Sequence, residues 1–240
     1  MKKIFFVVVT AFGFLISNAQ KDIVNDPDVE MRNVTGTFTA IKISGGIDLF
    51  LSQDDKEAVA VSSNDTKTKE AIKTVVENGT LRIYFDGDNK GWGNWKNRKM
   101  RAYVSFKTLE KLIASGASDV QVSGTITGSS LEMEMSGASD FKGAVRVSSL
   151  KMELSGSSDV KIAGSATVVT INSSGASDVN GYDLVTDICT AKASGASDIN
   201  ITVNKELNAN ASGASDIYYK GEGTIKESHT GGASTIAKKS

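Results

Sequence analysis

Hydrophobic and polar residues alternate in short runs through the second half of the chain, and these runs lie on both sides of a repeated five-residue motif. Leu131–Met135 and Leu150–Leu154 alternate with period two before the motif, and Val120–Val122 and Val160–Ile162 alternate after it. This periodicity is typical of strands with one buried face. The repeating unit is therefore predicted to be a strand, a tight turn, a second strand and a second turn.

The motif at the tight turn is Ser-Gly-Ala-Ser-Asp, and its copies are evenly spaced. From one motif aspartate to the next the steps are 21, 19, 19, 20 and 18 residues, and a further 19 lead to Thr235 in a degenerate last copy. Self-similarity at a near-fixed period indicates stacked repeats. Identical corners favour a parallel β-helix over antiparallel hairpins or a sandwich, because each coil then places its corner on the previous one.

We therefore predict an all-β protein built as a right-handed parallel β-helix with coils of roughly 20 residues. The same strand, corner and strand pattern occurs at Ile41–Leu51, so the solenoid is predicted to begin near Phe38. Residues 38–237 are expected to form one domain, preceded by a lead-in over residues 20–37. Within the domain, 38–113 form an N-terminal part and 114–237 carry the repeats.

One short amphipathic helix is predicted in the N-terminal part, over Thr66–Glu77. Asn64 or Asp65 can cap its start and Gly79 can end it. A single helix in a β chain is expected to cover the open end of the solenoid, where unpaired strand edges would otherwise aggregate.

The segment 86–99 has no periodicity and is rich in Gly, Asn and Lys. It lies between the predicted strands Leu81–Phe85 and Arg101–Phe106, so we expect a hairpin loop. Both tryptophans of the chain, Trp92 and Trp95, fall in it. Aromatic faces beside amides suit stacking on sugar rings or insertion into a partner protein. The alternative is that the indoles fold back over the end of the solenoid.

The motif aspartates are the second group of candidate site residues. Stacked corners would place these carboxylates about 5 Å apart, at a cost of about 1 kcal/mol for each adjacent pair. Either turn N–H groups and motif Ser hydroxyls donate hydrogen bonds to them, or Ca²⁺ binds between the coils. No other cofactor is indicated. The six residues are Asp119, Asp140, Asp159, Asp178, Asp198 and Asp216.

Composition excludes several functions. The chain has 27 Lys and Arg against 28 Asp and Glu, so it lacks the basic excess of a general nucleic-acid surface. His229 is the only histidine, which leaves a His-based triad or zinc site without partners. The carboxylates Glu132 and Glu134 near Lys151 have the pattern of a solvated sheet face rather than a supported catalytic acid pair. We therefore predict that the protein is not an enzyme.

The N-terminus has the pattern of an export signal. Lys2 and Lys3 precede the apolar run Ile4–Ile16, and small residues lead to a predicted cleavage after Ala19. The alternative is a membrane anchor, but the run is short for spanning a bilayer. Residues 1–19 are thus predicted to be a signal peptide, with no membrane-spanning segment left after its removal. The mature protein is expected in the periplasm, on the cell surface or outside the cell.

The chain resembles the head GIN domain family, secreted bacterial proteins described as autotransporter adhesins. The resemblance rests on Gly46-Ile47-Asp48, on Asn78-Gly79 followed by Leu81, and on the run of Ser-Gly-Ala-Ser-Asp corners. It covers residues 38–237. Leaders ending in Asn-Ala-Gln before Lys are common in Bacteroidota, where this family is abundant. The resemblance implies a right-handed β-helix with an adhesion role and no known catalytic apparatus.

These observations together predict a secreted or cell-surface, non-catalytic binding or adhesion module. Its partner is expected to be an extracellular or envelope glycan or protein, with Trp92 and Trp95 as candidate contact residues. One alternative is a structural envelope protein that associates with copies of itself as a homo-oligomer. A less favoured alternative is a degenerate carbohydrate-active enzyme.

Overall fold

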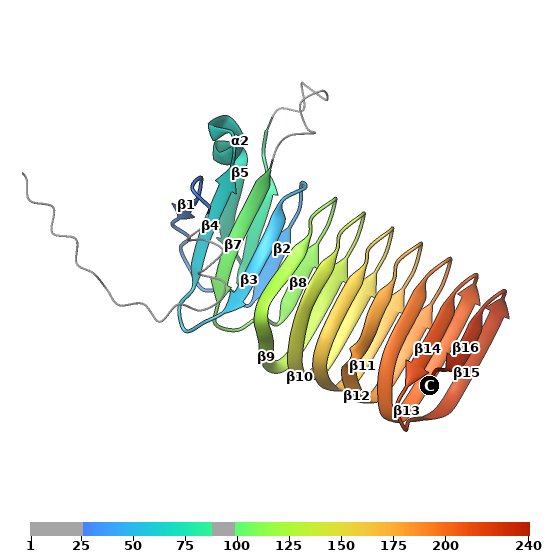
Figure 1. Ribbon diagram of the computed structural model, residues 1–240. Coiled ribbons are helices and arrows are strands. Elements are labelled where there is room, and N and C mark those ends of the chain that lie inside the picture. Colours follow the sequence, from blue (N-terminus) through green and yellow to red (C-terminus); the bar gives the residue numbers. More distant parts are fainter. Residues whose placement is uncertain (1–25, 88–98) are drawn as a thin grey trace, which may run out of the picture.

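The structure is a computed structural model in which residues 26–87 and 99–240 are described. It is a β-solenoid of about seven turns with one short helix, as Figure 1 shows, so the predicted fold class is confirmed. The predicted signal peptide and the two tryptophans lie outside the described residues. Over the ranges described, no helix has the length and apolar character needed to cross a membrane.

The N-terminal part contains eight strands and the helix. They are β1 Glu30–Arg32, β2 Ala40–Ile43, β3 Asp48–Gln53, β4 Ala58–Ser63, α2 Thr66–Ala71, β5 Ile72–Glu77, β6 Thr80–Phe85, β7 Met100–Phe106 and β8 Lys111–Ala114.

The repeat region contains the other eight strands. They are β9 Val120–Met135, β10 Phe141–Leu154, β11 Val160–Ser173, β12 Val179–Ala193, β13 Asp198–Gly213, β14 Asp216–Lys220, β15 Thr224–Gly232 and β16 Thr235–Lys238.

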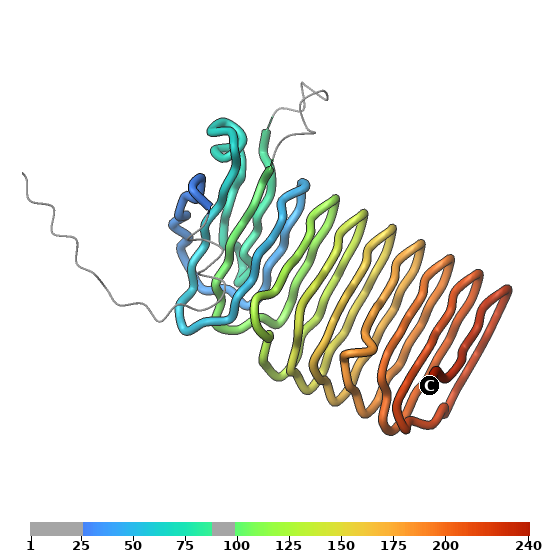
Figure 2. Tube along the Cα trace, viewed as in Figure 1, coloured from blue at the N-terminus to red at the C-terminus, as the bar shows by residue number. Residues whose placement is uncertain are grey.

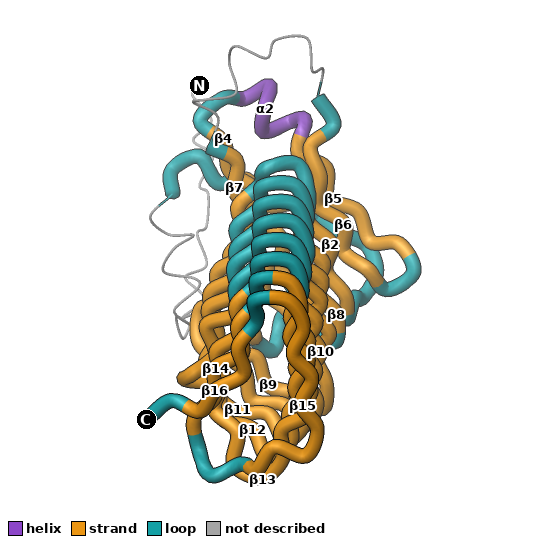
Figure 3. Tube along the Cα trace, turned by 90° about the vertical axis from the view of Figure 1, so that its right-hand side faces the viewer, coloured by secondary structure: helices purple, strands orange, loops and turns teal. Residues whose placement is uncertain are grey.

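Each strand from β9 to β13 makes almost a whole coil. It leaves a Ser-Gly-Ala-Ser-Asp corner along one wall of the solenoid, bends, and returns along the other wall to the next corner (Figure 2). Neighbouring coils pair in parallel, as in Phe141↔Val160 on the first wall and Leu150↔Val169 on the second. Figure 3 shows the corners stacked one behind another. We call the outer surface of the first wall the Asp face and that of the second wall the Asn face.

The core is the space between the two walls, filled by every second residue of each strand. Leu131, Met133 and Met135 are at most 1% exposed, and the equivalent residues of later coils are buried in the same column. The predicted alternation is thus confirmed. Burial raises the pKa of Cys189 to about 12, so this thiol acts as a small hydrophobic side chain rather than a reactive group.

The corner depends on a glycine whose carbonyl oxygen accepts a hydrogen bond from the next coil. Gly175 has φ +82°, and a Cβ added to it would lie 2.5 Å from the Gly156 oxygen. That same oxygen accepts a hydrogen bond from the Ala176 N–H at 2.8 Å. The equivalent bond joins most successive corners. A side chain at this glycine would therefore separate the coils at the point where they are held closest.

The second serine of the motif forms a ladder inside the corner. Ser177 is fully buried, and its Oγ accepts a hydrogen bond from the Ser158 N–H of the previous coil at 3.2 Å. The Ser158 Oγ donates in turn to the carbonyl oxygen of Ser155 in its own corner. This serine is needed because it gives partners to backbone groups that water cannot reach.

The N-terminal end is closed by strands rather than by the predicted helix. Only Thr66–Ala71 is helical, with Asp65 as the N-cap, because its Oδ2 accepts the Thr68 N–H at 2.8 Å. Thr68 is the only buried residue of α2, so the helix covers little of the core. Residues Ile72–Glu77 form β5 instead.

The helix prediction failed after Ala71 because a turn signal outweighs the helical spacing. Asn78 and Gly79 both have positive φ, at 49° and 72°. An Asn-Gly turn of this kind joins β5 to β6 as an antiparallel hairpin. The β-branched residues of β5 also favour a strand. The expected hairpin over 86–99 is wrong as well, because β6 pairs with β2 and β5 whereas β7 pairs with β3 and β4.

We predict that Gly175→Ala destabilises the protein by about 3 kcal/mol or more, through both the positive φ and the backbone collision. Gly128→Ala is the matched control, because nothing lies within 4 Å of its added Cβ. Urea denaturation should show a large fall in midpoint for the first variant and almost none for the second. Equal midpoints would show that the corner tolerates a side chain.

Candidate functional site

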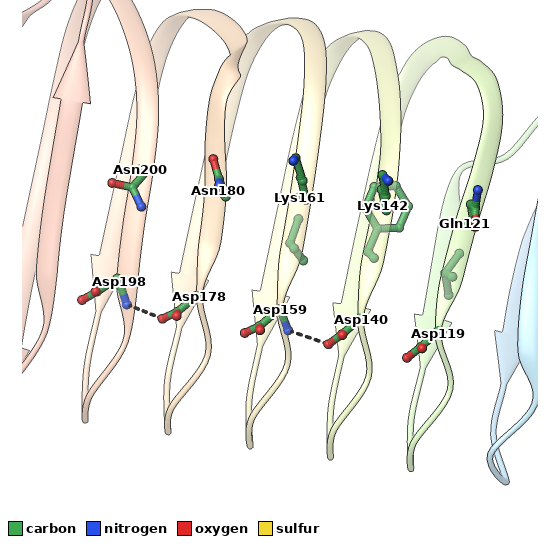
Figure 4. A pocket seen from close by; sticks show the side chains of 13 residues that line it. Asp119, Gln121, Asp140, Lys142, Asp159, Lys161, Asp178, Asn180, Asp198 and Asn200 are labelled. Carbon is green, nitrogen blue, oxygen red and sulfur yellow. Dashed lines mark hydrogen bonds between the residues drawn. The ribbon is translucent and has the colours of Figure 1, made fainter.

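A groove runs across the coils on the Asp face, just beyond the corners. It has a volume of about 560 Å³ and spans five successive coils. Figure 4 shows that each coil contributes an aspartate and, two residues later, a second outward polar side chain. The lining polar residues are Asp119, Gln121, Asp140, Lys142, Asp159, Lys161, Asp178, Asn180, Asp198 and Asn200.

The predicted aspartate column is present, and backbone hydrogen bonds link its members. The Asp198 N–H donates to Oδ1 of Asp178 at 3.1 Å, and the Asp216 N–H donates to Oδ1 of Asp198 at 3.2 Å. Asp140 accepts from the Asp159 N–H in the same way (Figure 4). Each such carboxylate thus receives a donor from the following coil, and this offsets repulsion within the column.

The expectation that motif serines donate to these carboxylates is not met. The second serine of the motif points into the corner and bonds to backbone groups, as Ser158 and Ser177 do. The N–H part of the hydrogen-bond prediction is therefore confirmed, while the hydroxyl part is wrong for these serines. The physical reason is that these hydroxyls are buried beside backbone N–H and carbonyl groups that need hydrogen-bond partners, and they bond to those groups instead of the exposed carboxylates.

The pKa values of three carboxyls in this row are shifted, in two directions. Burial, together with the charge of Asp119, raises the pKa of Asp48 at the N-terminal end. Burial likewise raises the pKa of Asp159, with a contribution from its neighbours in the column. At the other end the Tyr218 hydroxyl, 2.9 Å from Oδ2 of Asp216, lowers the pKa of that carboxyl. Of these three carboxyls, Asp216 therefore keeps its charge to the lowest pH.

Metal binding by the column stays a prediction. Within residues 26–87 and 99–240 no group of three or more Asp, Glu, His or Cys side chains is arranged to hold a metal ion. Ca²⁺ prefers six to eight oxygen ligands. The carboxylates instead form a single row in which several already accept an N–H. This arrangement favours hydrogen bonding over calcium as the way in which the column is stabilised.

A second outward row runs beside the aspartates and ends in an aromatic ring on each side. At the N-terminal end Phe50 is paired with Gln121, and its ring stacks on that of Tyr103 with centroids 5.1 Å apart. At the C-terminal end lies Tyr218, with the Lys239 ammonium 3.9 Å from the centre of its ring. Between these rings the row carries Gln, two Lys and two Asn, so it offers both donors and acceptors.

The lead-in segment covers the far end of the Asp face. Oδ2 of Asp26 accepts a hydrogen bond from the Tyr103 hydroxyl at 2.8 Å and pairs with Arg101 at 3.4 Å. Burial and the nearby Asp26 carboxylate raise the pKa of Tyr103 to about 12. Phe50 is therefore the last partly exposed ring of the row on this side, because Tyr103 is buried.

The Asn face differs between its two halves. In the first half Lys111 contacts Glu134 at 2.6 Å and Glu132 at 3.3 Å, while Lys151 contacts Glu132 at 2.9 Å and Glu153 at 3.4 Å. These residues form a network of alternating charge, as the solvated-face interpretation of Glu132 and Glu134 predicts. The second half carries mostly Asn, Thr and Ser and has a smaller groove of its own.

Sequence reasoning identified the aspartate column but not the second outward row beside it or the aromatic ends of that row. Phe50 and Tyr218 each stand two residues after an aspartate, Asp48 and Asp216, but only the aspartates were followed from coil to coil. Counting two residues beyond every motif aspartate would have found this row. The contact role of Trp92 and Trp95 remains a prediction because both lie outside the described residues.

Comparison with known proteins agrees with the fold and the repeat. A family model described as "Putative auto-transporter adhesin, head GIN domain" matches residues 37–223. This confirms the resemblance inferred from the motifs. No curated protein matches the chain.

Several solved structures are similar to the chain. A putative adhesin from Bacteroides fragilis is 23% identical, with a TM-score of 0.80 over 89% of this chain and 98% of that one. A putative lipid binding protein from Parabacteroides distasonis is 20% identical, with a TM-score of 0.64 over 89% and 97%. A putative adhesin from Parabacteroides merdae is 17% identical, with a TM-score of 0.61 over the same shares. At such identities the likeness shows the fold alone.

We predict opposite pH-dependent effects for two substitutions within the column. Asp48 has a raised pKa, so its charge destabilises the fold above that pKa, and the cost disappears as the pH falls through it. Asp48→Asn should therefore raise the melting temperature near pH 7. Asp216 has a lowered pKa, so its contribution is present above the ordinary aspartate pKa of 3.8 and is lost as the pH falls through the lowered value.

Asp216→Asn should accordingly lower the melting temperature near pH 7. Both differences from the unsubstituted protein should shrink as the pH falls below about 4, that of Asp48 first and that of Asp216 last, because the Asp216 carboxyl is protonated only at lower pH. Thermal melts followed by circular dichroism across this range measure both effects. Shifts of the same sign in the two variants would contradict the assignment.

We also predict that calcium has no effect on stability. If N–H donors stabilise the column, EDTA and millimolar CaCl₂ should both leave the melting temperature unchanged. A rise in calcium that EDTA reverses would establish the alternative, in which the ion binds between coils.

Proposed function

We propose that this chain, which belongs to the head GIN domain family, is an exported, non-catalytic binding module whose ligand is a glycan chain lying along the Asp face. The observation that supports this most directly is the groove on that face, together with the polar row that crosses it between Phe50 and Tyr218. Adhesin-like relatives support a binding role in general, and the glycan is our own inference.

The chemistry of the groove suits sugar hydroxyl groups. Carboxylates accept hydrogen bonds from them, while the amides of Asn180 and Asn200 both donate and accept. The equivalent side chains repeat once per coil, at the strand spacing of about 4.8 Å. That repeat is close to the length of one sugar unit in an extended chain, so successive sugars meet similar groups.

The ends of the row are suited to the apolar faces of sugar rings. The Phe50 ring is partly exposed and stacked on Tyr103, which holds it in place. The Tyr218 ring is fixed by its hydrogen bond to Asp216. Rigid aromatic side chains provide contact area at little entropic cost. A bound chain would thus be hydrogen-bonded along its length and stacked near its ends.

The arrangement of carboxylates supports binding rather than hydrolysis. Glycoside hydrolases place two carboxyl groups on either side of the bond that they cleave. Here the carboxylates form one row on one wall, and several are held by N–H groups of the next coil. None of them can approach a bound sugar from the opposite side, so a degenerate enzyme is the weaker alternative.

We predict that single substitutions in the row weaken glycan binding. Asn180→Ala and Asn200→Ala should each reduce affinity about fivefold, because each removes hydrogen bonds of about 1 kcal/mol to the ligand. Asn204→Ala is the matched control, because this exposed asparagine lies at the bend between the walls. A glycan array followed by calorimetry on the best ligand gives the measurement. Equal losses in all three variants would contradict the proposed site.

The tryptophans provide a second, separable test. We compare the mature protein with a Trp92→Ala/Trp95→Ala variant on the same array. If these indoles contact the ligand, the variant loses binding that Asn204→Ala retains. Full binding by the variant would restrict the contact surface to the sheet faces, and no binding by any form would overturn the proposed function in favour of self-association. Sedimentation of the same samples distinguishes that outcome.

A further inference from the structure

Lys192, on the second half of the Asn face, is a cation surrounded by uncharged side chains. Lys192 of β12 lies between Asn172 of β11 and Asn210 of β13, which are paired with it across the strands. Along its own strand the neighbouring outward residues are Thr190 and Ser194. The four diagonal positions carry two Ser, one Thr and one Asn. All eight neighbours are therefore neutral groups able to form hydrogen bonds.

The ammonium of Lys192 has no ion pair among the described residues. This separates it from Lys111 and Lys151 on the same face, each of which contacts two carboxylates. The nearest carboxylate in its row belongs to Glu153, whose backbone lies two coils away, or roughly 10 Å. That carboxylate is paired with Lys151 at 3.4 Å. Lys192 therefore has no carboxylate of its own in this row.

The surface around Lys192 is also hollowed. A groove of about 310 Å³ runs between the row of Lys192 and the first serines of the corners. Its polar lining includes Glu153, Asn172, Lys192, Ser194, Asn210 and Ser212. Its floor is formed by small inward side chains such as Ala193, which is 2% exposed. The inward residues are smaller in this part of the core, and the surface above them is hollowed. On the first half of the face, the Glu–Lys network covers the surface instead.

Several donors that line this groove have no hydrogen-bond partner within the described part of the chain. They are the Lys192 ammonium, the hydroxyls of Ser194 and Ser212 and the amide of Asn210. The Glu153 carboxylate at the edge of the groove is already paired, because its Oε1 accepts a hydrogen bond from Asn172 at 2.8 Å and contacts Lys151 at 3.4 Å. An ammonium flanked by free hydroxyl and amide donors is a surface that suits an oxyanion.

We propose that this groove binds the acidic group of an anionic sugar, with Lys192 contacting the carboxylate or sulfate. Ser194, Ser212 and Asn210 would then bond to the same oxyanion or to hydroxyls of the same ring. The site lies on the wall opposite the Asp face, so it stands independently of the glycan proposed there. The aspartate column of that other face would repel the same acidic ligand, and this directs anionic sugars to the Asn face.

The test measures binding of the mature protein to immobilised polygalacturonate, dextran sulfate and uncharged dextran. We expect binding to one or both acidic polymers, weakening as salt is added, and much weaker binding to dextran. Comparison of the two acidic polymers shows whether a carboxylate or a sulfate is preferred. Absence of binding to both acidic polymers would overturn the proposal, as would equal binding to dextran.

Two matched variants locate the site. Lys192→Gln should lower the affinity for the acidic polymer about tenfold, which is the value of one charge-assisted hydrogen bond. Lys111→Gln removes a lysine of the same face that is paired with Glu132 and Glu134, outside the groove, and should leave the affinity unchanged. Lys142→Gln tests the Asp face and should also have no effect. The proposal fails if Lys111→Gln or Lys142→Gln lowers binding as much as Lys192→Gln does.

Two controls in the same experiment show that Lys192→Gln folds normally and that the Asp face is not the anion site. Lys192 is exposed and has no ion pair to lose, so Lys192→Gln should melt at the same temperature as the unsubstituted protein. Asn180→Ala should weaken binding of the Asp-face glycan and leave the acidic polymer unaffected. Loss of acidic-polymer binding in Asn180→Ala but not in Lys192→Gln would move the anion site to the Asp face and contradict the proposal.

Discussion

The structure depends on how closely one corner can approach the next. The carbonyl of each corner glycine lies where the following glycine would carry its Cβ, as with Gly156 and Gly175, and it accepts the N–H of the residue after that glycine. Glycine alone fits this position, because its φ is positive and the space beyond its Cα is filled by backbone. With the corner fixed, both walls are held at strand spacing, and the register of every coil follows.

The fixed register also determines which outward side chains become neighbours. Equivalent residues of successive coils stack in columns, so each face must stabilise a column of similar side chains. The Asp face does so with backbone donors, which pass from each coil to the carboxylate of the one before, as from Asp198 to Asp178. The first half of the Asn face uses alternating charge around Glu132. The second half uses mostly neutral side chains, and there Lys192 has no ion pair within residues 26–87 and 99–240. The two halves of one wall are thereby suited to different ligands.

Much of this architecture could be predicted from the sequence because it is encoded by local repetition. Period-two alternation gave the walls, and the repeated motif gave the parallel stacking and the aspartate column. The prediction failed where one local signal overrode another, as when the Asn78-Gly79 turn drew Ile72–Glu77 into a hairpin. The inward direction of Ser177 and the isolation of Lys192 could not be predicted, because each depends on groups contributed by neighbouring coils.

Because the corner bonds each coil only to its neighbours, the length of the solenoid is not set by its chemistry. Adding or removing one unit of about 20 residues would extend or shorten both grooves without altering any existing contact. If the Asp face binds a glycan as proposed, the number of coils then sets how many successive sugars fit between the Phe50 and Tyr218 rings. Proteins of this design could thus change the chain length they select by duplication alone, while the composition of each face changes separately.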